Sequence, residues 1–82
     1  MDRSLSVIAA EIRQDWKPVH YTAKPYLDAM HSLKTMNDKY YADSATSVVA
    51  YFLANASTWK GETARRVKKE LNKMLKTAYK NN

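Results

Sequence analysis

Six cationic side chains recur at helical spacing near the end of this 82-residue chain. At 100° per residue they fall within an arc of about 100° on a helical wheel; they are Arg65, Arg66, Lys69, Lys73, Lys76 and Lys80. A row of guanidinium and ammonium groups can contact phosphate oxygens or an acidic protein surface. The spacing therefore predicts a binding face for nucleic acid or for an acidic protein, with a merely solvated helix face as the alternative.

The distribution of charge along the chain singles out the same segment. Residues 1–58 carry six basic and six acidic side chains, whereas residues 59–82 carry eight basic side chains and only two acidic ones, Glu62 and Glu70. The whole net charge of +6 therefore belongs to the last quarter of the chain. Like charges at i,i+4, such as Arg65 and Lys69, cost a helix about 0.2–0.5 kcal/mol each at low salt. Part of the pattern also has a simpler cause, because late lysines complement the helix dipole.

The predicted basic face has no side chain suited to reading bases. It carries no interleaved aromatic or amide group; Asn72 lies on its edge and Thr77 just outside it. The segment after Gly61 is also a poor helix-turn-helix, because Glu70 stands where an apolar residue is usual. We therefore expect any nucleic-acid contact to be directed at the backbone and weakly specific.

Catalytic and metal-binding patterns are missing from the sequence. His20 and His31 are the only histidines, there is no cysteine, and no H-E-x-x-H pattern or Gly-rich phosphate loop occurs. Asp28 and His31 stand at i,i+3, which is most simply an exposed helix pair. We expect no enzyme, no metal site and no cofactor.

The aromatic residues suggest a second kind of interface. Tyr40, Tyr41 and Tyr51 are candidate interface aromatics, since exposed aromatic rings anchor protein contacts. Loop tyrosines that only cover a small core are the alternative. Trp16 and Trp59 fall where core or staple residues are expected.

The apolar periodicity predicts an all-α fold that positions these residues, in one domain covering residues 1–82. One glycine and two prolines leave little scope for hairpin turns. We expect a compact bundle of three to four helices with a basic C-terminal helix. The expected helices are Leu5–Trp16 capped by Ser4, Pro25–Met36, about 45–56 capped by Asp43 or Ser44, and Glu62–Tyr79 after a turn at Gly61.

A membrane partner is not expected. The longest apolar run covers residues 48–54, far short of the roughly 20 residues that span a bilayer. The apolar side of the last helix, which includes Val67 and Leu71, is needed by the core of so small a domain. A weak homodimer remains open.

Three stretches together resemble a group of small, uncharacterised proteins encoded by bacteriophages and prophages. They are Ser4–Lys17, Lys24–Met30 and Tyr40–Leu71, and the most distinctive part runs from Asp43 to Arg66. The resemblance implies an accessory protein that works in the cytoplasm of a bacterial host. Proteins of this kind often bind nucleic acid or inhibit host machinery, including CRISPR–Cas defence. The resemblance assigns no role to any residue.

The favoured hypothesis is a non-enzymatic binding protein whose basic helix docks on nucleic acid or a nucleoprotein. The first alternative is a protein-binding inhibitor or adaptor that acts on an acidic bacterial host protein. The third hypothesis is a structural or assembly component of a virion.

Overall fold

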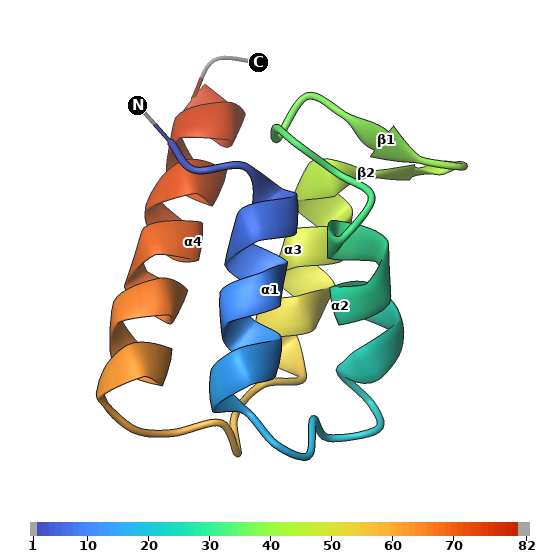
Figure 1. Cartoon of the computed structure of the whole chain (residues 1–82). Coiled ribbons are helices and arrows are strands. Elements are labelled where there is room, and N and C mark those ends of the chain that lie inside the picture. Colours follow the sequence, from blue (N-terminus) through green and yellow to red (C-terminus); the bar gives the residue numbers. More distant parts are fainter. Residues whose placement is uncertain (1, 81–82) are drawn as a thin grey trace.

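The computed structural model describes residues 2–80, which fold into four helices and one short hairpin (Figure 1). In chain order the elements are α1 (Leu5–Asp15), α2 (Lys24–Met30), β1 (Lys39–Tyr40), β2 (Asp43–Ser44), α3 (Ala45–Ala54) and α4 (Glu62–Lys80). The prediction of a helical bundle is confirmed. The prediction of a strictly all-α chain is wrong, because β1 and β2 pair in an antiparallel hairpin.

The four helices pack in a ring, in which each contacts its neighbours along the chain and α1 also contacts α4. Figure 1 shows α1 and α3 running in one direction and α2 and α4 in the other. Antiparallel neighbours joined by short connections are typical of up-and-down bundles. This topology gives α4 two partners, α1 and α3, and leaves its remaining side uncovered.

Helix starts follow the chemistry expected from the sequence. The Ser4 hydroxyl accepts a hydrogen bond from the Val7 N–H at 3.2 Å, and the Ser44 hydroxyl does the same for Ser47 N–H. Of the two caps proposed for α3, Ser44 is therefore the one used. Gly61 has a φ of +115°, a conformation that glycine adopts without a Cβ clash, and α4 begins directly after it.

Aromatic rings close the end of the bundle where α1 and α3 finish. Trp16 and Trp59 stack with ring centroids 5.7 Å apart, and both meet Phe52 edge-on. The Trp59 indole N–H donates to Asp15 Oδ2 at 2.8 Å, so its one polar group is satisfied although the side chain is buried. The prediction that both tryptophans belong to the core is confirmed, and this cluster fixes the chain just before α4.

The second helix is shorter than predicted, ending at Met30 rather than Met36. Beyond it, the carbonyl oxygens of Leu33 and Lys34 each accept a hydrogen bond at 2.9 Å from the first turn of α1. A continued helix would direct these carbonyls along its own axis. The apolar spacing up to Met36 therefore reflects packing of an irregular segment rather than a helix.

The hairpin lies between α2 and α3, where the apolar spacing predicts no strand. The Asp38 carboxylate accepts hydrogen bonds from the backbone N–H groups of Lys34 and Thr35, at 2.8 and 3.1 Å. These two bonds lower the pKa of Asp38, the contact with Lys34 most, and they organise the approach to β1. The two-residue turn places Tyr41 at a φ of 55°, an uncommon conformation for a bulky side chain.

Candidate functional site

The outer side of α4 carries the predicted row of cations. Its opposite side is buried in the bundle, and the buried residues recur every three or four positions: Ala64, Val67, Leu71, Met74 and Leu75. Because these residues fix the rotation of the helix, the residues opposite them face solvent. All six predicted cations are exposed.

Five of the six cations form no ion pair with any acidic side chain in residues 2–80; they are Arg65, Lys69, Lys73, Lys76 and Lys80. From the first to the last they span about 22 Å along the helix axis at 1.5 Å per residue. We refer to these five residues as the α4 cation row. Their charge is compensated only by solvent and salt, so the row attracts anions.

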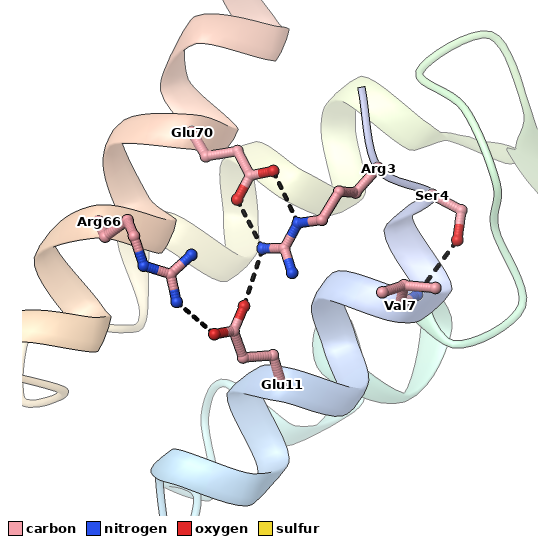
Figure 2. Close-up of polar contacts among 6 residues, drawn as sticks. All are labelled: Arg3, Ser4, Val7, Glu11, Arg66 and Glu70. Atoms are coloured by element: carbon pink, nitrogen blue, oxygen red, sulfur yellow. Dashed lines mark hydrogen bonds and ion pairs between the residues drawn. The ribbon is translucent and has the colours of Figure 1, made fainter. Parts of the chain in front are cut away.

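Arg66 differs from the other five because it points toward α1. Its guanidinium pairs with the Glu11 carboxylate, which also lies 2.8 Å from Arg3 Nη2 (Figure 2). Arg3 in turn holds Glu70 through two contacts, Nε to Oε2 at 3.0 Å and Nη2 to Oε1 at 2.6 Å. The four side chains alternate in charge and connect the N-terminal segment, α1 and α4.

This four-residue ion network forms the border of the cation row. Hydrogen bonding to Arg66, and then to Arg3, lowers the pKa of Glu11, although partial burial opposes the shift. Hydrogen bonding to Glu70 raises the already high pKa of Arg3 further. Both shifts favour the charged forms of Glu11 and Arg3. The network also gives a structural reason for an acidic residue at position 70 of the basic helix, because the Glu70 carboxylate binds Arg3.

Near the start of α4 the surface is hollowed on both sides of Arg65. One hollow of about 440 Å³ lies over Glu62, Thr63, Arg66 and Lys69 as well as Arg65. The other, of about 370 Å³, is lined by Ser57, Trp59, Lys60, Gly61, Ala64, Arg65 and Lys68. The first hollow includes the carboxylate of Glu62, whereas no acidic residue lines the second.

Lys68 lies beside the second hollow, and the spacing of the six predicted cations does not include it. Its Nζ donates to the Trp59 carbonyl at 2.6 Å and lies 5.8 Å from the centroid of the Trp59 ring. Partial burial lowers the pKa of Lys68, and the nearby charge of Lys60 lowers it further. On the helical wheel Lys68 falls beside the apolar stripe, a position where a lysine stem is expected to pack against the core.

The candidate tyrosines do not come together as one patch. Tyr40 and Tyr41 meet edge-on in the hairpin, where Tyr40 packs on the core and Tyr41 is 88% exposed. Tyr51 is half exposed on α3 and stacks on Tyr26 of α2. Tyr79, which is not among the predicted interface aromatics, is 56% exposed on the last turn of α4, close in sequence to Lys76 and Lys80.

Both histidines contact other side chains of the bundle. Arg13 reaches from α1 to both Asp28 and His31, and its Nε lies 2.7 Å from His31 Nε2. The predicted pair of Asp28 and His31 thus meets through an arginine from another helix. His20 bonds with the Thr22 hydroxyl at 2.8 Å and stacks on Tyr21. Within the described chain, no three histidine or acidic residues gather in a way that could hold a metal ion.

The fold and the charge distribution define a small four-helix protein with a one-sided basic helix. None of the helices in residues 2–80 is both long and apolar enough to cross a membrane. Comparison with protein-family models, curated proteins and solved structures found no match to the chain.

Proposed function

We propose that this protein is a non-enzymatic binding module whose α4 cation row docks on the phosphate backbone of nucleic acid, alone or within a nucleoprotein. The observation that carries the proposal is the row itself, five exposed cations without an acidic partner in residues 2–80. Its length of about 22 Å corresponds to roughly six base pairs of duplex at 3.4 Å each.

The cost of the row to the folded chain supports a binding role. Arg65 and Lys69, Lys69 and Lys73, and Lys76 and Lys80 are like-charge pairs at i,i+4. Each pair destabilises the helix by about 0.2–0.5 kcal/mol. Elsewhere in the fold the same chain pairs its arginines with carboxylates, as Arg3, Arg13 and Arg66 show. Arg65 is therefore the one arginine in residues 2–80 without an ion pair, whereas no lysine of these residues forms one, inside or outside the row.

The polar side chains at the edges of the row favour contact without base reading. The Asn72 amide donates to the Lys68 carbonyl at 2.9 Å, and the Thr77 hydroxyl donates to the Lys73 carbonyl at 3.1 Å. Each side chain therefore already donates one hydrogen bond to its own helix. Contacts made by the row would position the protein on a phosphate backbone and carry little sequence information.

Charge reversal with a matched control tests the proposal. Lys69→Glu/Lys73→Glu changes the row, while Lys17→Glu/Lys24→Glu makes the same change in net charge at exposed positions outside the row. Fluorescence anisotropy with a labelled 20-base-pair duplex at 50 mM salt should show weakening of at least tenfold for the first variant. The second should lose less than threefold. Absence of wild-type binding, or equal losses in both variants, would refute the proposal.

A second candidate function is the inhibition or bridging of a bacterial host protein, as the resemblance to phage-encoded proteins implies. The observation that favours it is Tyr41, which is almost fully exposed at the hairpin tip in a conformation unusual for its size. Pull-down from nuclease-treated host lysate tests this candidate. A partner that survives nuclease and is lost in Tyr41→Ala supports it, and a partner lost with the nucleic acid contradicts it.

A further inference from the structure

The second hollow beside Arg65 gathers positive charge without a carboxylate. Lys60, Arg65 and Lys68 line it together with Ser57, and the backbone at Gly61 forms part of its wall. An added Cβ at Gly61 would meet no atom within 4 Å, so the backbone there is open to a ligand. Clusters of this composition match the oxygen-rich surface of a phosphate group.

The three cations are not compensated inside the molecule. No ion pair in residues 2–80 involves Lys60, Arg65 or Lys68. The charge of Lys60 adds to the effect of burial in lowering the pKa of Lys68, which shows that the two ammonium groups repel one another. Lys68 is held in place by the Trp59 carbonyl and by the face of the Trp59 ring. An anion in the hollow would relieve this repulsion and would meet a cation that is already positioned.

We infer that the hollow bounded by Ser57, Lys60, Arg65 and Lys68 is a binding site for a phosphomonoester group. A terminal phosphate carries nearly two negative charges and three free oxygens, whereas a phosphodiester within a strand carries one charge. Three cations and a hydroxyl suit the terminal group better. We assign this group to the 5′-phosphate at the end of a nucleic-acid strand, an assignment that rests on the function proposed above. Free inorganic phosphate is the other source with the same chemistry.

Titration with inorganic phosphate, followed by ¹⁵N NMR, tests the site directly. Gly61 is the only glycine in the chain, so its amide gives a single, easily assigned signal in the wall of the hollow. We expect saturable movement of this signal, with sodium chloride at equal ionic strength moving it little. The hollow is not a phosphate site if chloride produces the same movement.

Two single-charge variants supply the matched comparison. Lys60→Gln removes one cation from the hollow, and this exposed side chain donates no hydrogen bond within residues 2–80. Lys76→Gln removes a cation of α4 that lies about three helical turns from Arg65. Lys60 is exposed, so solvent screening reduces the strength of its charge-assisted hydrogen bond, and its loss in Lys60→Gln should weaken phosphate binding by about five- to tenfold. Lys76→Gln should change it less than twofold. Equal effects would overturn the inference.

Oligonucleotides with and without a 5′-phosphate identify the source of the group. Tighter binding of the phosphorylated strand, lost in Lys60→Gln, supports recognition of a strand end. Saturation by inorganic phosphate without any preference between the strands supports the site and assigns it to free phosphate. Lys76→Glu/Lys80→Glu, which changes the row about three turns from the hollow, should weaken oligonucleotide binding but leave the inorganic phosphate titration unchanged. The experiments can therefore refute the proposed role of the α4 cation row and the proposed phosphate site independently of each other.

Discussion

The bidentate contact between Arg3 and Glu70 should measurably stabilise the fold, because it fastens the segment before α1 to α4 (Figure 2). The side chains are 36% and 25% exposed, so solvent screens the pair only in part. Hydrogen bonds to charged groups contribute about 1.5–3 kcal/mol, and fully exposed pairs about 0–1 kcal/mol. We therefore expect a coupling of about 1–2 kcal/mol for this partly exposed contact.

A double-mutant cycle isolates this coupling. Arg3→Gln, Glu70→Gln and the double variant are compared by urea unfolding, with Asp43→Asn as a control carboxylate that makes no ion pair in residues 2–80. The Arg3 ion pair with Glu11 is broken in both variants that lack Arg3, so its effect cancels. Glu70→Gln should lower the melting temperature by roughly 4–8 °C for each kcal/mol of stability removed. A coupling below about 0.3 kcal/mol would refute the reasoning.

Three further predictions concern single side chains. Tyr41→Gly should be more stable than Tyr41→Ala by about 0.5–1 kcal/mol in thermal unfolding, because both variants lose the ring that meets Tyr40 and only glycine adopts a positive φ without strain; equal melting temperatures contradict this. The lowered pKa of Asp38 supplies stability that is complete above its unfolded pKa of about 3.9 and is lost as pH falls through the folded pKa. Asp38→Asn should therefore be less stable at pH 7 but approach wild type near pH 2, which acid unfolding followed by circular dichroism measures. Glu11→Gln should release Arg66 and tighten duplex binding at 50 mM salt more than Asp43→Asn does, and equal gains would show a net-charge effect only.

Local rules predicted much of the fold. Serine hydroxyls cap α1 and α3, and the 3.6-residue period of α4 correctly separates its buried and exposed sides. The end of α2 and the hairpin were not predictable in this way. The end of α2 depends on backbone hydrogen bonds from a distant segment, which run from the first turn of α1 to the carbonyls of Leu33 and Lys34. The hairpin depends on antiparallel backbone pairing of Lys39 with Ser44 and of Tyr40 with Asp43. A helical period describes only neighbours along one helix.

The candidate site was predictable to a similar extent. Periodicity identifies all six cations of α4 as exposed, but it cannot show that Arg66 meets Glu11, 55 residues earlier in the chain. Nor does it show that Lys68 turns toward Trp59 to line a hollow with Lys60. Contacts between helices decide which cations are available to a partner, and these contacts depend on the tertiary fold.

The salt dependence of duplex binding tests the central claim most directly, because counterion release counts the phosphates that the protein neutralises. Five phosphates bound by the α4 cation row predict a slope of log K against log salt of about −4 to −5. Lys69→Glu/Lys73→Glu should make this slope shallower by about 2, one unit for each phosphate that no longer meets a cation, while Lys17→Glu/Lys24→Glu should leave it nearly unchanged. A wild-type slope between about 0 and −1, or the same slope in all three proteins, would contradict the account.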